Sequence, residues 1–200
     1  YFIKQFVKTQ KRVEEYKNLG AKFAKWRAVF PISDKTPGAI ATRVNCELLA
    51  RYAAICQSLD IIPIIEPEVL MDGSHPIEKS LEVNVKVLKQ VFNYLYDHKV
   101  IIEGILIKPS FVHPGKDNKE GASLVSVAKM TVKFLKEAVS VAVPGIVFLS
   151  GGDSPEESTD HLNEMNKIKT THHDLPWELS FSFGRALQEP VLKLWQGKPE

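Results

Sequence analysis

The chain has 200 residues, a formal net charge of +2 and 44% hydrophobic residues. This length can build one domain with a sizeable core, and the composition is ordinary for a globular chain. The small net charge argues against nucleic-acid or membrane-surface binding, and no stretch resembles a membrane-spanning helix or a signal peptide. We therefore expect a single cytoplasmic domain without nucleic-acid or membrane partners.

The two cysteines agree with a reducing compartment. Cys46 and Cys56 fall in one predicted helix and are ten residues apart. At the helical rise this separation is about 15 Å, which is too far for a disulfide. We expect reduced, packed thiols, as in cytosolic proteins.

The first strand carries two cations. A helix is predicted for residues 1–19, with Val13, Tyr16 and Leu19 as its apolar stripe. Residues 23–30 then alternate as a strand, which places Lys25 and Arg27 on one face. Two cations on one strand face indicate either an anionic partner or a solvated edge, and the spacing favours neither.

Two carboxylates end the second predicted strand. A helical pattern over 41–59 precedes the apolar run 61–65, which leads into Glu66 and Glu68. In an extended segment both side chains project to the same side. One of them is a candidate general acid or base. The alternative is a pair of loop carboxylates, or partners for the two cations of the first strand.

A lysine ends the third predicted strand. After a helix over 81–95, the apolar run 101–107 meets Lys108 and Pro109. An ammonium removed from water loses affinity for its proton, and a neutral amine can form a Schiff base with a carbonyl. The alternative is a lysine that emerges into water at a strand end, and this stretch alone favours that alternative roughly twofold.

Two glycine-containing turns predict a phosphate site. Ser150-Gly151-Gly152 leads into a helix start at 154–157, where a Ser cap, a Pro and a Glu are present. Free N–H groups at such a start bind anions. Gly184-Arg185 follows the next strand, and barrels often hold a phosphate between the last two strand loops. The remaining predicted elements are a helix at 124–138, a strand at 145–152, a helix from 154 to about 165, a strand at 177–183 and a helix from 189.

The strand–helix alternation predicts an α/β fold with a parallel sheet. The polar residues that end four of the strands are separated by 41, 42 and 42 residues: Lys25, Glu66, Lys108 and Ser150. Active sites of parallel barrels are built from the carboxyl ends of several strands, whereas an open doubly wound sheet uses one switch point. Five strands that each contribute a polar group favour the barrel.

The six histidines show no metal-binding spacing. His172-His173 is predicted to lie in a loop, and the others are far apart in the sequence, so we expect surface or loop histidines. No phosphate-loop or dinucleotide motif is present. The sequence therefore predicts neither a metal nor a cofactor.

Several blocks together resemble class I fructose-bisphosphate aldolase, the Schiff-base type. They are Phe23–Arg27, Leu49–Ala53, Pro63–Glu68, Leu106–Pro109, Val143–Gly152 and Ser180–Gln188. The resemblance covers about 11–200 and implies a TIM (β/α)8 barrel, of which residues 1–200 form one partial domain with about strands 4 to 8. Residues 1–10 do not match. Ser110 stands where the family usually has Asn, and Asp153 where it often has Gln.

The resemblance also implies roles for the site residues. Lys108 forms the imine with the ketose phosphate, Glu66 is the acid/base, and Glu68 supports the hydrogen-bond network. Lys25 steers charge near the reacting hydroxyls. The residues expected to bind substrate are Arg27, Ser150, Gly151, Ser182, Gly184 and Arg185.

The activity implied is the reversible cleavage of fructose 1,6-bisphosphate into dihydroxyacetone phosphate and glyceraldehyde 3-phosphate, in glycolysis. No cofactor or metal is required. Family resemblance further implies a homo-oligomer, usually a tetramer, with cytoskeletal proteins as candidate partners. The alternative is a catalytically inactive aldolase-like chain that acts only as a binding or assembly partner.

Overall fold

The computed structural model describes residues 2–172 and 174–198, so Tyr1, His173 and the last two residues lie outside it. Five parallel strands form one sheet in the order β1-β2-β3-β4-β5. Each strand pairs with the strand that precedes it in the sequence, which is the order of consecutive strands in a (β/α) barrel. The strands are β1 (Phe23–Phe30), β2 (Ile62–Val69), β3 (Leu106–Ile107), β4 (Gly145–Phe148) and β5 (Glu178–Phe181).

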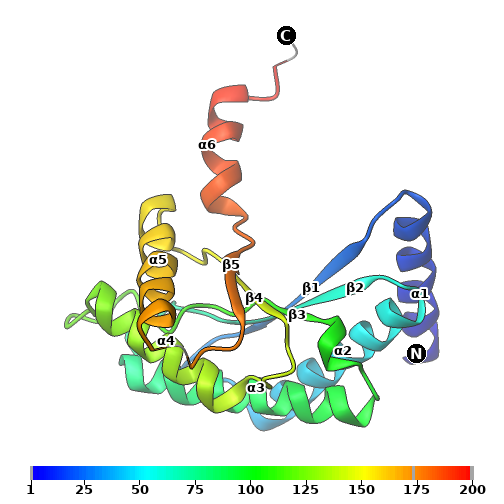
Figure 1. Ribbon diagram of the computed structural model, residues 1–200, viewed down its shortest axis with the longest axis horizontal. Coiled ribbons are helices and arrows are strands. Elements are labelled where there is room, and N and C mark those ends of the chain that lie inside the picture. The colour runs from blue at the N-terminus through cyan, green and yellow to red at the C-terminus, as the bar shows by residue number, and fades with distance from the viewer. Residues whose placement is uncertain (1, 173, 199–200) are drawn as a thin grey trace.

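Helices connect the strands and cover one side of the sheet. In Figure 1, α2, α3 and α4 lie together below the sheet, while α6 extends away from it on the opposite side. None of the helices in the described part of the chain is long and apolar enough to cross a membrane. The helices are α1 (Phe2–Asn18), α2 (Ala39–Ser58), α3 (Ile77–Asp97), α4 (Leu124–Ala138), α5 (Pro155–His172) and α6 (Arg185–Trp195).

The core lies between the sheet and these helices. Ile65, Ile107 and Ile146, on the three central strands, are fully buried in it together with leucines of the helices. β2 is buried along nearly its whole length, as predicted for a strand with both faces covered. The edge strands differ, because Phe23 of β1 and Phe181 of β5 are exposed.

The third strand is much shorter than predicted. Only Leu106–Ile107 is strand, and Ile102–Gly104 forms a 3₁₀ turn, η1, in place of the expected extended run. The side-chain amide of Gln57 explains the difference: its oxygen accepts from the Ile101 N–H at 2.9 Å, and its nitrogen donates to the Ile101 and Gly104 carbonyls. A side chain from α2 thus takes hydrogen bonds that a neighbouring strand would otherwise supply.

Other element boundaries also differ from the prediction. α5 continues to His172 instead of ending near Met165, and α6 begins at Arg185 instead of Glu189. The stripe predicted on α1 is only partly correct, because Val13 is buried while Leu19 is exposed. The predicted strands at 145–152 and 177–183 are shorter in the structure, at Gly145–Phe148 and Glu178–Phe181.

Both cysteines are free and buried in α2, which confirms the prediction of packed thiols. Burial raises the pKa of Cys46 to about 12 and that of Cys56 to about 11. A thiol with a raised pKa is a poor nucleophile at neutral pH. The cysteines therefore contribute packing to α2.

The predicted capping box begins α5. The Ser154 hydroxyl accepts from the Glu157 N–H at 3.1 Å, and the Glu157 carboxylate accepts from the Ser154 N–H at 2.9 Å. These hydrogen bonds lower the pKa of Glu157 below its ordinary value, the bond from the Ser154 backbone being the largest cause. They also fix the direction of the helix that follows the Gly151-Gly152 turn.

We expect replacement of Ile65 by Ala to lower the free energy of unfolding by about 2–5 kcal/mol, because it leaves a cavity in the centre of the sheet. Ile62→Ala is the matched control, since Ile62 lies on the same strand and is 47% exposed. Its effect should stay below about 1 kcal/mol. Urea unfolding followed by circular dichroism measures both, and equal losses would contradict the assigned core.

Replacement of Glu157 by Gln should have a pH-dependent effect. A carboxylate whose pKa is lowered by folding stabilises the fold above its ordinary pKa, and this contribution is lost as the pH falls through the folded-state pKa. We expect a loss of about 0.3–1 kcal/mol in unfolding free energy at pH 7, and a smaller loss near pH 3. Glu156→Gln in the same turn is the control, and a Glu157→Gln effect that is equal at both pH values would contradict the role of its charge.

Candidate functional site

Polar side chains from the ends of all the central strands line one open cleft. The cleft has a volume of about 340 Å³. It contains cations, carboxylates and a glycine turn, which is the composition of a site for an anionic ligand. Its lining residues are Lys25, Arg27, Glu66, Glu68, Lys108, Leu149, Ser150, Gly151, Gly184 and Arg185.

The register of the sheet brings these residues to one edge. Arg27 of β1 lies directly opposite Glu66 of β2. The Lys108 N–H donates to the Ile65 carbonyl at 2.8 Å, and the Leu149 N–H donates to the Pro109 carbonyl at 3.2 Å. Parallel pairing therefore continues beyond the short β3. Residues about 42 positions apart in the sequence lie side by side at the same edge of the sheet.

Glu66 is a buried carboxylate between two ammonium groups. Its side chain is 5% exposed; Oε1 lies 3.3 Å from the Lys108 Nζ, and Oε2 lies 2.8 Å from the Lys25 Nζ. Both contacts are ion pairs by distance, although Oε2 has no hydrogen bond of good geometry. This oxygen can accept a hydrogen bond or a proton from a bound ligand.

Lys108 is buried, and its side chain is 8% exposed. This contradicts the alternative in which the lysine emerges into water at a strand end. Its Nζ lies against the Glu66 carboxylate and faces the cleft lined by Ser150 and Gly151. A buried amine beside a carboxylate has the surroundings of a nucleophile with its own acid/base partner.

Arg27 and Glu68 form the second ion pair of the site. The Arg27 Nε donates to the Glu68 carboxylate, and this hydrogen bond is the main cause that raises the pKa of Arg27. The side chains of Lys25 and Arg27 are 41% and 45% exposed, whereas both glutamates are buried. The two cations thus pair with the carboxylates of β2 and also remain accessible to a ligand.

The other end of the cleft is built from backbone and one arginine. Gly151 has φ of +60°, a conformation that favours glycine. Gly184 and Arg185 begin α6 and reach the same cleft. Ser182, which the resemblance also predicted to bind substrate, follows β5 but does not line the cleft.

Sequence reasoning noted Ser110 only as a departure from the family's usual Asn and assigned it no role. It is buried, and its hydroxyl accepts from the Val69 N–H and donates to the Val69 carbonyl, both at 3.1 Å. These bonds tie the end of β2, which carries Glu68, to the segment after Lys108. A serine beside a proline gave no signal in the sequence, because its partner lies 41 residues away.

Sequence reasoning also failed to place two histidines. His113 and His161 were expected as separate surface or loop residues, but their rings lie 4.8 Å apart, and His161 is buried on α5. Asp153 joins them through a 3.0 Å contact with the His113 Nε2. Burial is the main cause that lowers the pKa of His161, and His113 lowers it further. Both effects favour the neutral form of the imidazole.

Comparisons with known proteins agree with the geometry. The family model for class-I fructose-bisphosphate aldolase matches residues 3–200, and so reaches into the first ten residues, where the motifs gave no match. A probable class 1 fructose-bisphosphate aldolase of Xylella fastidiosa is 50% identical over 92% of this chain and 54% of its own length. Cytosolic aldolase 5 of Arabidopsis thaliana is 51% identical over 94% of this chain and 52% of its own. A relative from Chlamydomonas reinhardtii, 52% identical over 95% of this chain and 49% of its own length, is named chloroplastic.

A solved structure shows the same fold. It is fructose-bisphosphate aldolase from Plasmodium falciparum, in complex with TRAP and a small-molecule inhibitor. It superimposes with a TM-score of 0.89 at 43% identity, over 94% of this chain and 54% of that one. The five-stranded sheet is thus part of a TIM barrel, and the chain spans about half the length of the relatives it matches. The chain belongs to the class I fructose-bisphosphate aldolase family.

Proposed function

We propose that this chain carries the Schiff-base machinery that cleaves fructose 1,6-bisphosphate into dihydroxyacetone phosphate and glyceraldehyde 3-phosphate, and that runs the condensation in reverse. The observation that carries the proposal is the buried Lys108, whose Nζ lies 3.3 Å from the Glu66 carboxylate in a cleft with further cations. Membership of the aldolase family supports the same reaction.

The first step is the formation of an imine. The unprotonated Lys108 amine attacks the keto carbon of the sugar, and the carbinolamine that results loses its hydroxyl as water. Glu66 is placed to accept a proton from the nitrogen and to deliver one to the departing hydroxyl, because its carboxylate contacts this amine. The product is a protonated imine, which withdraws electrons from the adjacent carbons.

The second step breaks the carbon–carbon bond. A base removes the proton from the hydroxyl beyond the scissile bond, the aldehyde leaves, and the bonding electrons move into the imine to give an enamine. The carboxylate of Glu66 is the base candidate, because its Oε1 lies 3.3 Å from the Lys108 Nζ. Protonation of the enamine and hydrolysis of the imine then release dihydroxyacetone phosphate and regenerate the amine.

The cations determine how the substrate is oriented. Arg185 and the Ser150-Gly151 turn lie at one end of the cleft and are suited to the phosphate next to the keto group. Lys25 and Arg27, on β1, lie toward the distal hydroxyls and phosphate. A positive cleft also attracts a doubly phosphorylated sugar from solution.

The assembly and location of the protein are part of the proposal. We infer a homo-oligomer, a tetramer by family resemblance, in the cytoplasm, with cytoskeletal proteins as candidate partners. The cytosolic relative from Arabidopsis supports this location. Sedimentation of the purified chain tests the oligomeric state, and a monomer at all concentrations would contradict it.

Borohydride trapping tests the Schiff base directly. Reduction in the presence of dihydroxyacetone phosphate should leave a covalent mass adduct on the peptide that contains Lys108, because an imine is reduced to a stable secondary amine. Lys108→Arg should abolish the adduct, whereas Lys99→Arg should leave it unchanged. A full-length relative serves as the positive control. No adduct on this chain beside a labelled relative would favour the inactive binding or assembly partner.

Replacement of Arg185 by Met should weaken the phosphate end of the site. We expect about 10–100-fold weaker binding of glycerol 3-phosphate, because a charged hydrogen bond contributes about 1.5–3 kcal/mol. This ligand has no carbonyl, so the measurement by calorimetry is independent of imine formation. Arg43→Met, on the exposed face of α2, is the matched control. Equal affinities for both variants would exclude Arg185 from phosphate binding.

A further inference from the structure

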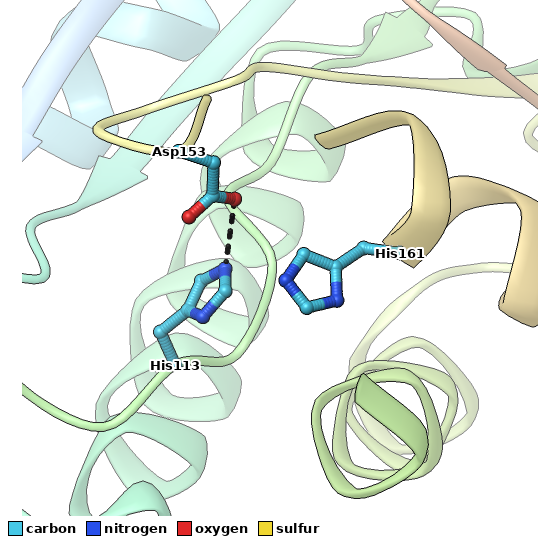
Figure 2. Close-up of side chains that lie close together, drawn as sticks. All are labelled: His113, Asp153 and His161. Atoms are coloured by element: carbon cyan, nitrogen blue, oxygen red, sulfur yellow. Dashed lines mark hydrogen bonds and ion pairs between the residues drawn. The ribbon is translucent and has the colours of Figure 1, made fainter. Parts of the chain in front are cut away.

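Three potential metal ligands meet behind the glycine turn, outside the residues assigned to the reaction. His113 comes from the loop after β3, Asp153 from the turn after β4, and His161 from α5. One ligand atom from each lies within 4.8 Å of the others. Figure 2 shows the two rings and the carboxylate converging from three separate segments.

Of the three residues, His161 is the one with a buried ring nitrogen that has no partner. It is 8% exposed, and its Nδ1 is buried without a hydrogen bond. The other ring nitrogen, Nε2, is directed toward His113 and Asp153 in Figure 2, with no dashed line to either. Nδ1 itself points away from the other two residues in Figure 2, so Nε2 is the atom that this ring presents to them.

The surroundings favour a cation. A cavity of about 330 Å³ opens beside the cluster and gives access from solvent. Its lining contains three carboxylates, those of Asp153, Glu157 and Asp160, against the single ammonium of Lys116. An anionic ligand would meet this excess of negative charge, whereas a divalent cation would be attracted by it.

We propose that His113, Asp153 and His161 bind a divalent transition metal of the zinc class. Two imidazoles and one carboxylate are ligands that such metals prefer, with bond lengths of about 2.0–2.2 Å. The ligand atoms lie within 4.8 Å of one another and have to approach by about an ångström for this geometry. The fourth position faces the cavity and is open to water. The proposal is independent of the aldol chemistry.

Metal binding would restrain the conformation of the turn that lines the catalytic cleft. The Asp153 N–H donates to the Ser150 carbonyl at 3.0 Å. A metal bound to Asp153 would therefore also restrain Ser150, the residue that begins the anion-binding turn. His113 and His161 belong to the segments on either side of this turn. Binding would therefore join three segments that no covalent bond connects, and it would raise the stability of the chain by mass action.

Calorimetric titration of the tag-free 200-residue chain with Zn²⁺ tests the proposal. We expect one saturable site per chain, and a rise in thermal midpoint that a chelator reverses. His161→Asn and Asp153→Asn should each weaken binding by at least about tenfold. His98→Asn, at the end of α3, is the matched histidine control and should leave the affinity unchanged. No saturable binding, or binding that His161→Asn leaves unchanged, would overturn the site.

Co²⁺ provides a measurement that does not depend on how well the variants fold. Titration of the unsubstituted chain should produce the intense visible bands of a four-coordinate cobalt site with nitrogen and oxygen ligands, and Zn²⁺ should displace them. Spectra that remain those of hydrated Co²⁺ would show that the cluster is only a hydrogen-bonded Asp–His pair beside a second histidine.

Discussion

The site depends on the buried carboxylate of Glu66 and its contacts with two lysines. A buried ion is stable only when it is paired, and removal of one partner from such a pair typically costs about 3–5 kcal/mol. Glu66 has one oxygen near Lys108 and the other near Lys25. The three residues lie on or directly after three consecutive strands, so the charges are compensated only when β1, β2 and β3 pair in this register.

The same constraint connects folding with chemistry. The hydroxyl of Ser110 and the Lys108 N–H extend the pairing of β2 and β3 beyond the short strand, and so hold the nucleophile beside its acid/base partner. Arg27 forms an ion pair with Glu68 next to this centre. The edge strands contribute less to this arrangement, because Phe23 and Phe181 are exposed. An unpaired strand edge can form hydrogen bonds with a further strand.

Much of the fold and the central site could be predicted from local patterns. Period-two alternation located β1, apolar runs located the central strands, and the capping box located the start of α5. The predictions that were wrong concern features that depend on contacts between residues far apart in the sequence. Gln57 replaces the first part of β3 by a turn, and His113, Asp153 and His161 come together only through packing of separate segments. Metal-ligand spacing rules detect ligands close in sequence, and this cluster has a 40-residue gap between His113 and Asp153.

A double-mutant cycle between Glu66 and Lys108 measures how strongly these two side chains depend on one another. The free energies of unfolding of Glu66→Gln, Lys108→Met and the double variant are compared with that of the unsubstituted chain. We expect a coupling energy of about 1–3 kcal/mol, because each single change leaves a buried charged partner behind and the double change leaves none. Additive losses would contradict it, since they would mean that the two side chains do not depend on one another.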